Sequence, residues 1–155
     1  MSDELNSLNT KLAEVSNRLF GDRIALLVVD PSTLLPTRKN ARYMPKEVFD
    51  QLTANVKADS ALQSVPLCHR LADGRIEILS GNHRVRSAIE AGLKEIIILC
   101  FTTELKASRK RAIQLSHNAI VGQDDAQLLV ELWKEIDQMA DRIYSGLDST
   151  AIGEI

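Results

Sequence analysis

Two features are scarce in this sequence, cysteine and long apolar runs. Cys68 and Cys100 are its two cysteines, and both lie inside apolar, strand-like runs. That setting favours buried, inert thiols in a reducing compartment. No apolar run approaches the roughly 20 residues that a membrane span needs, and the polar N-terminus lacks the apolar core of a signal peptide. The sequence therefore predicts a cytoplasmic protein that does not contact membranes.

An excess of charge of one sign is lacking as well, since 19 Lys and Arg residues stand against 21 Asp and Glu residues, for a net charge of -2. This balance argues against a protein that coats nucleic acid by bulk electrostatics, although a local basic patch stays open. Hydrophobic residues make up 45% and charged residues 26% of the chain, as in soluble globular proteins. A chain of 155 residues without repeats or low-complexity segments is expected to form one ordinary domain with a real core.

The apolar pattern predicts an α/β or α+β domain with a small mixed sheet, in the order helix, strand, helix, strand, strand, helix, strand, helix, helix. The segment 31–45 is expected to be a loop, because it holds three prolines. The chain divides into an amphipathic helix at 1–20, a central domain at 21–122, and a C-terminal helix with a linker-like tail at 123–155. The expected strands lie at 24–30, 65–71, 75–80 and 95–101, with a hairpin turn at 72–74.

Apolar faces identify the buried sides of the expected helices. The first helix ends at Gly21, and its leucine stripe is expected to dock on the domain, with a dimer contact as the alternative. A helix at 105–118 follows the last strand. The stripe consists of Leu5, Leu8, Leu12, Val15 and Leu19; the other buried faces are Val48, Phe49, Leu52 and Val56 after Pro45, then Val85, Ala88 and Ile89 before a left-handed Gly92, and finally Leu128, Leu129, Leu132, Trp133, Ile136 and Ile143 in a last helix capped by Asp124 or Asp125.

The most informative segment is LSGNHRVRSA, residues 79–88, where a strand turns into a helix. Gly81 lets the backbone turn sharply and approach a ligand closely. Asn82 is expected to be the N-cap, with His83 and Arg84 in a first turn whose amides favour an anion. Arginines oppose the helix dipole there by about 0.3–1 kcal/mol each, unless a phosphate lies beside them. The turn therefore predicts a phosphate site, and a solvated arginine pair is the alternative.

These residues also resemble a known family. Residues 80–88, Ser-Gly-Asn-His-Arg-Val-Arg-Ser-Ala, resemble the Gly-Glu-Arg-Arg-x-Arg-Ala signature of the ParB N-terminal domain and the Gly-Cys-His-Arg box of sulfiredoxin. Residues 37–38 resemble the Pro-Arg element of the family, residues 65–81 its strand pair, and residues 117–122 its Glu-Asn-x-Gln-Arg motif. The resemblance covers residues 24 to about 136. It implies a ParB/sulfiredoxin-like fold, that of the ParB-like nuclease domain, with a small mixed sheet flanked by helices and a helical C-terminal part.

The same resemblance implies a nucleotide- or phosphate-binding domain in a DNA-associated system of the partition, plasmid or phage type. The ligand is expected to be CTP or ATP, with Mg²⁺ as its companion, and a homodimer is an open alternative to a monomer. ParB proteins carry their DNA-binding motif C-terminal to this domain, so the chain is expected to be a piece of a longer protein. The implied nucleotide-binding residues are Gly81, Asn82, His83, Arg84, Arg86, Arg38, Thr37, His117 and Asn118.

Two departures from the family weaken the expectation of catalysis. Asn82 stands where sulfiredoxin has its reactive cysteine, and without a thiolate the sulfinic-acid repair cannot run. Asn82 and His117 also stand where ParB has glutamates that help to hold a metal or orient a water. We therefore expect slow or absent NTP hydrolysis and weaker Mg²⁺ binding, and we assign no catalytic residue.

Three further interpretations stay open. The basic residues Lys106, Arg109, Lys110 and Arg111 could contact DNA phosphates or form a solvated helix face. The histidines have no metal-ligand spacing, so no metal site is expected. In place of nucleotide binding, the fold could serve protein–protein contacts through the leucine stripe, or nuclease or kinase activity.

Overall fold

The computed structural model describes residues 2–38, 43–147 and 152–153, and its centre is a four-stranded sheet in the order β1-β4-β2-β3. β1 is antiparallel to β4, β4 is parallel to β2, and β2 is antiparallel to β3. The predicted α/β fold with a small mixed sheet is therefore confirmed. The strands are β1 (Ile24–Val29), β2 (Leu67–Arg70), β3 (Ile76–Ser80) and β4 (Ile96–Phe101).

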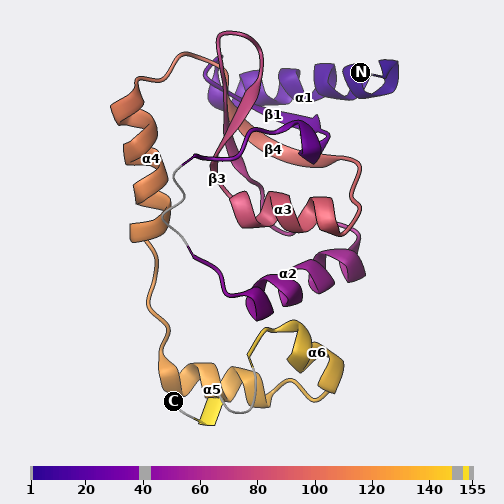
Figure 1. Cartoon of the computed structure of the whole chain (residues 1–155), viewed down its shortest axis with the longest axis vertical. Coiled ribbons are helices and arrows are strands. Elements are labelled where there is room, and N and C mark those ends of the chain that lie inside the picture. The colour runs from indigo at the N-terminus through magenta and orange to yellow at the C-terminus, as the bar shows by residue number, and fades with distance from the viewer. Residues whose placement is uncertain (1, 39–42, 148–151, 154–155) are drawn as a thin grey trace.

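Helices surround this sheet (Figure 1). α3 and α2 are stacked below it, α4 runs along one side, and α5 and α6 lie at the end of the molecule opposite α1. Within the described ranges, no helix is long and apolar enough to cross a membrane. The helices are α1 (Asp3–Phe20), α2 (Lys46–Asp59), α3 (Asn82–Glu90), α4 (Ala107–Ala119), α5 (Ala126–Lys134) and α6 (Met139–Tyr144), with a short 3-10 helix, η1 (Pro31–Thr33), after β1.

The two faces of the sheet carry separate apolar clusters. On one face, Cys68 and Cys100 are buried with residues of β3, β4 and α3. On the other face, Leu67 of β2 and Leu79 of β3 pack against Ile113 of α4. Both thiols are free and buried, as predicted, and burial raises their pKa to about 12 for Cys68 and about 11 for Cys100.

α1 docks on the domain, but only part of the predicted stripe is covered, since Leu5 and Leu12 are half-buried. Leu8, Val15 and Leu19 are 42%, 49% and 65% exposed. Polar residues face the domain instead: Asn9 accepts a hydrogen bond from Val28 N (2.7 Å) and donates to Val28 O (3.0 Å), while Ser16 Oγ accepts one from Leu26 N (2.8 Å). β1 is an edge strand, so its outward backbone groups need such partners. The predicted apolar stripe is therefore wrong for Leu8, Val15 and Leu19, and the polar contacts of Asn9 and Ser16 share the docking face with Leu5 and Leu12.

α2 and α3 match their predicted buried faces in part. Phe49, Val56, Val85 and Ala88 are buried, whereas Val48 and Ile89 are exposed, which corrects the prediction. Val48 lies on a face of α2 that borders a cleft, and the fully buried Ser87 occupies the inner side of α3 in place of Ile89. Gly92 (φ +82°) ends α3 as predicted, since Gly92 N bonds Ile89 O and Leu93 N bonds Ala88 O.

The C-terminal part forms two helices and not the single one predicted. Asp125 caps α5 by accepting a hydrogen bond from Leu128 N at 3.0 Å. The chain then turns back, with Arg142 lying 4.1 Å from the ring centre of Trp133 and donating to Ile136 O. α5 ends at Lys134 although residues 135–138 contain neither Gly nor Pro. Leu128, Leu132 and Ile143 are exposed, so they were wrongly expected in a buried face.

The remaining segments agree with the sequence prediction except in one loop. Gly74 (φ +88°) forms the predicted hairpin turn, with Leu71 N bonded to Arg75 O at 2.8 Å. The expected loop 31–45 contains η1 and a bridge of Leu35 with Glu77 of β3, and its residues 39–42 lie outside the described part. Residues 148–151 and 154–155 of the expected tail also lie outside it.

Candidate functional site

The turn between β3 and α3 has the geometry that the sequence predicts, with one change of register. Gly81 has a φ of +106°, and a Cβ there would lie 3.2 Å from atoms of Pro66. Gly81 itself is the N-cap, because Asn82 already belongs to α3, and the Asn82 side chain is hydrogen-bonded to Thr37. The prediction of Asn82 as the N-cap is thus wrong. Only glycine fits the turn readily, since a side chain would be strained by φ and crowded by Pro66.

The side chain of Asn82 is engaged by Thr37. Thr37 N donates to Asn82 Oδ1 at 3.0 Å, and Asn82 Nδ2 donates to Thr37 Oγ1 at 3.0 Å. Thr37 Oγ1 in turn donates to Ile78 O at 2.5 Å. These bonds fix the segment that follows η1 against the first turn of α3, and they use both ends of the Asn82 amide.

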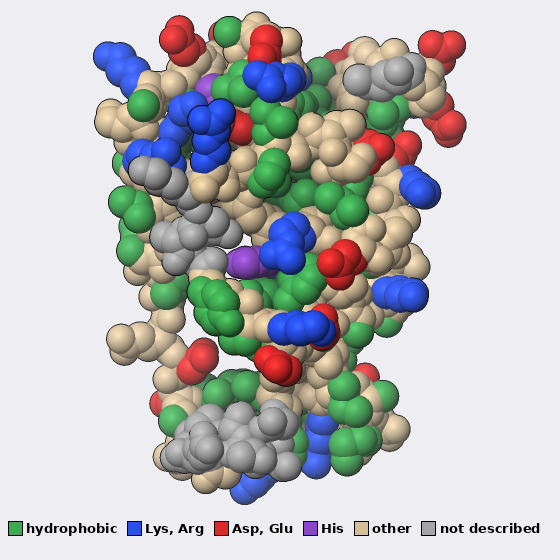
Figure 2. Space-filling model, in the orientation of Figure 1, with side chains coloured by type: hydrophobic (Ala, Val, Ile, Leu, Met, Phe, Trp, Pro, Cys, Tyr) green, Lys and Arg blue, Asp and Glu red, His purple; other side chains and the backbone are tan. Residues whose placement is uncertain are grey.

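A cleft of about 620 Å³ opens at this turn. The space-filling view shows the molecule hollowed between the α4 side and the body that carries α3, with a histidine side chain at the hollow (Figure 2). Seven of the nine predicted nucleotide-binding residues line the cleft. They are Thr37, Gly81, Asn82, His83, Arg84, His117 and Asn118.

Two predicted site residues do not line this cleft. The guanidinium of Arg86 lies 4.6 Å from the ring centre of Phe49 on α2, so it is held on another face of α3. Arg38 follows Thr37 as an exposed residue outside the lining set. Arg84 and Arg86 are only two positions apart in α3, but Arg84 lines the cleft and Arg86 does not.

Sequence reasoning missed most of the wall that α4 supplies. Arg111, Gln114 and Leu115 line the cleft with His117 and Asn118, and Arg111 Nη1 donates to Gln114 Oε1 at 2.9 Å. Residues three and four apart share one face of a helix, so the spacing from Asn118 back to Arg111 was the available signal. The sequence places Arg111 in the predicted DNA-contacting group, but in the structure it lines the cleft together with Gly81.

The predicted DNA-contacting group divides into two settings. Lys106 and Arg109 are exposed at the beginning of α4, where basic side chains gather on the surface (Figure 2). Lys110 instead lies 2.8 Å from Glu77 of β3, and Arg111 lines the cleft. A contact between this group and DNA stays a prediction, now limited to its exposed members.

The charge of the cleft differs from that of the chain. Arg84 and Arg111 contribute two positive charges, and the described lining residues include no Asp or Glu. The chain as a whole has a net charge of -2. Among the described residues, no group of three or more His, Cys, Asp or Glu side chains is arranged to hold a metal ion. With the amino end of α3 at one wall, the cleft is built to attract an anion.

The fold and this cleft define an α/β domain with a basic site at a strand-to-helix turn, and comparisons with known proteins agree with the fold. The chain is 30% identical, over 95 residues, to a probable chromosome-partitioning protein ParB from Coxiella burnetii; the match covers 57% of this chain and 31% of that protein. The chain thus spans about a third of the length of this curated relative. No family model matches the sequence.

Solved structures give the same fold. C-terminally truncated ParB from Caulobacter crescentus, crystallised with CTP-gamma-S, superimposes with a TM-score of 0.62 at 18% identity, covering 83% of this chain and 71% of that one. A Pnob8-like ParB-N domain gives a TM-score of 0.50 at 19% identity over 77% of this chain and 46% of that one. The chain contains a ParB-like domain, as its sequence predicted.

Proposed function

We propose that the cleft binds a nucleoside triphosphate, with the phosphates at the first turn of α3. The observation that carries this proposal is the cleft itself: Arg84 of α3 and Arg111 of α4 line it beside the amino terminus of α3, and the described lining holds no carboxylate. Amides, helix dipole and guanidinium groups all favour the same negative charge. Arg84 and the turn amides would bind phosphate oxygens, while Arg111 and Asn118 would close the opposite side.

CTP is the first ligand to test. The Caulobacter ParB that shares this fold was crystallised with CTP-gamma-S, which favours the same class of ligand here. The apolar side chains of Val65 and Leu115 line the cleft together with Ser64 and Ser80, so the cleft offers both apolar and hydrogen-bonding surface beyond the basic groups. ATP is the second candidate, because phosphate contacts alone do not distinguish bases.

We infer that hydrolysis is slow or absent. General-base activation of a water needs a group that takes its proton, and the described cleft residues include no carboxylate for this role. The two histidines of the cleft, His83 and His117, are assigned to ligand contacts in this proposal. Protein-bound Mg²⁺ is usually held by one or two carboxylates together with substrate phosphates. The donor set therefore does not fit a Mg²⁺ ion held by protein ligands, and no step is assigned to one. The same absence argues against the nuclease and kinase alternatives.

The biological setting that we propose is a partition-type DNA system. The name of the Coxiella relative supports it, although the chain covers 31% of that protein, so DNA binding by the whole protein stays a proposal. Within this domain, Lys106 and Arg109 are exposed and free to approach DNA phosphates. The proposal includes chromosome, plasmid and phage systems alike. It also includes a homodimer as an alternative to a monomer.

Calorimetric titration with CTP, ATP, GTP and UTP, each with and without Mg²⁺, tests the proposed ligand. Saturable binding of one nucleotide, with or without the metal, supports the proposal. Absence of binding at millimolar concentrations of all four would contradict it. That result would favour the alternative of a protein-interaction domain, for which the exposed Leu8, Val15 and Leu19 of α1 would be the first surface to mutate.

A further inference from the structure

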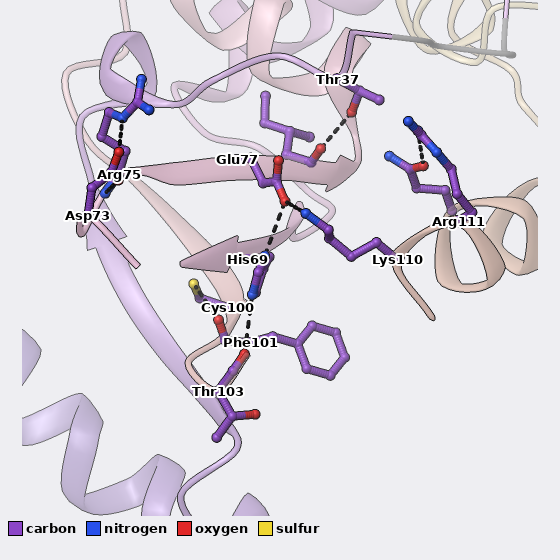
Figure 3. A network of polar contacts seen from close by, with 12 residues as sticks. Thr37, His69, Asp73, Arg75, Glu77, Cys100, Phe101, Thr103, Lys110 and Arg111 are labelled. Atoms are coloured by element: carbon purple, nitrogen blue, oxygen red, sulfur yellow. Dashed lines mark hydrogen bonds and ion pairs between the residues drawn. The ribbon is translucent and has the colours of Figure 1, made fainter. Parts of the chain in front are cut away.

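A charged network joins α4 to the sheet on the side of the molecule away from the buried cysteines. Lys110 Nζ lies 2.8 Å from Glu77 Oε1, and His69 Nδ1 lies 3.1 Å from the same oxygen (Figure 3). His69 Nε2 lies 3.2 Å from the carbonyl oxygen of Thr103. One carboxylate oxygen of β3 therefore receives contacts from β2 and from α4.

The three side chains of this network are buried or largely buried. His69 is 4% exposed, and the side chains of Glu77 and Lys110 are each 26% exposed. Burial acts to raise the pKa of Glu77, but hydrogen bonds with Lys110 and His69 outweigh it, so that the pKa is lowered and the carboxylate is charged near neutral pH. Removing one partner would leave a partly desolvated charge, which is more costly than losing an exposed pair.

Lys110 lies on α4, the helix that supplies one wall of the cleft. Ile113, three residues on, packs against Leu67 and Leu79 and anchors the same side of the helix. Arg111 and Gln114 lie on the adjoining side and line the cleft. At 3.6 residues per turn, each residue advances about 100° around the helix, so a modest rotation of α4 would move both side chains away from the Gly81 turn.

Residue 77 also connects to the opposite wall through the backbone. Leu35 forms a bridge with Glu77, in which Leu35 N donates to Ile76 O at 2.9 Å and Ile78 N donates to Leu35 O at 2.8 Å. Two residues later, Thr37 holds Asn82. β3 thus fixes both the segment that carries Thr37 and the helix that carries Arg111.

We infer that Glu77 and Lys110 are positioning residues for the nucleotide cleft, with His69 holding the Glu77 carboxylate in place. None of the three lines the cleft, so they act by fixing α4 and not by touching the ligand. The inference rests on the proposed function, because it assigns these residues a role in nucleotide affinity.

The test compares Lys110→Met with Lys106→Met and Lys110→Arg. Lys110→Met removes the ion pair and keeps a long side chain, whereas Lys106→Met removes the same charge from the exposed start of the helix. CTP affinity, measured where every variant is fully folded, is expected to fall about threefold to tenfold in Lys110→Met. It should stay near the wild-type value in Lys106→Met and Lys110→Arg.

Hydrogen exchange of the ligand-free proteins supplies a measurement that does not depend on nucleotide. Amides of α4 after residue 110 are expected to exchange faster in Lys110→Met and at the wild-type rate in Lys106→Met. Unchanged exchange, or equal CTP affinity of wild type and Lys110→Met, would overturn the positioning role while leaving the proposed function intact. A wild-type protein that binds no nucleotide would overturn the proposed function and, with it, this role.

Discussion

Thr37 and Asn82 hold each other through two hydrogen bonds across 45 positions of the sequence. The Asn82 oxygen accepts from the Thr37 amide, and its nitrogen donates to the Thr37 hydroxyl, whose own proton goes to Ile78 O. Both ends of the Asn82 amide therefore make hydrogen bonds within the protein. This is a second reason, besides its chemistry, to expect that Asn82 does not activate a water.

Asn82→Glu restores a carboxylate at the position where the ParB signature has glutamate. We expect this variant to release phosphate from CTP faster than wild type, because a carboxylate can orient a water and accept its proton. Losing the amide donor to Thr37 should cost about 1 kcal/mol of stability. Phosphate release by wild type, Asn82→Glu and the uncharged Asn82→Gln measures the effect. Brisk hydrolysis by wild type would contradict this expectation, because another group, such as a cleft histidine or an acid outside the described lining, would then take the proton.

Gly81→Ala tests the turn. A side chain at φ +106° with a contact of 3.2 Å to Pro66 should lower the free energy of unfolding by about 1–3 kcal/mol. Gly122→Ala is the matched control, because a Cβ there meets nothing within 4 Å, and its effect should be about 0.5 kcal/mol or less. Urea denaturation of both variants measures the two losses of unfolding free energy. Equal losses would mean that the backbone at Gly81 is not constrained.

Asn9→Ala tests how α1 covers the sheet edge. The change leaves Val28 N and Val28 O without their side-chain partner, which should cost about 1–3 kcal/mol. Thr10→Ala removes a hydroxyl that bonds only one turn back in its own helix, so it should change stability by about 0.5 kcal/mol or less. If denaturation curves show the two variants to be alike, α1 does not depend on these edge contacts.

α1 also shows where prediction from sequence stops. Its existence and its end at Gly21 could be read from leucine spacing, but the side that faces the domain was predicted only in part, at Leu5 and Leu12. A prediction from apolar periodicity assumes that the helix packs on an apolar surface. This helix instead lies along the edge strand β1, where Asn9 and Ser16 form hydrogen bonds with backbone groups. Only the sheet order reveals that edge.

The candidate site shows the same limit. The glycine turn, Arg84 and Asn118 were identified from local sequence because their chemistry is local to a strand-to-helix turn and a motif. Arg111 and Gln114 were not, since they reach the cleft only when α4 packs across β3. The break between α5 and α6 was also missed, because residues 135–138 contain no Gly or Pro that would signal it.

The buried cysteines give a prediction about reactivity. With pKa values of about 12 for Cys68 and about 11 for Cys100 and no solvent exposure, neither thiol is a thiolate at neutral pH. A thiol reagent should label neither residue in the native protein and both in urea. Rapid labelling of the native chain would mean that the sheet opens locally, or that this core is packed differently.

The central claim is that nucleotide binds at the Gly81 turn, and a comparison of Arg84→Ala with Arg86→Ala tests it most directly. Both changes remove one arginine from α3, but Arg84 lines the cleft whereas Arg86 lies over Phe49. A charge-assisted hydrogen bond is worth about 1.5–3 kcal/mol, so Arg84→Ala should weaken CTP binding roughly tenfold to a hundredfold. Arg86→Ala should leave the affinity nearly unchanged where the protein is folded. Equal losses in the two variants would contradict a turn-centred site and indicate a diffuse basic surface.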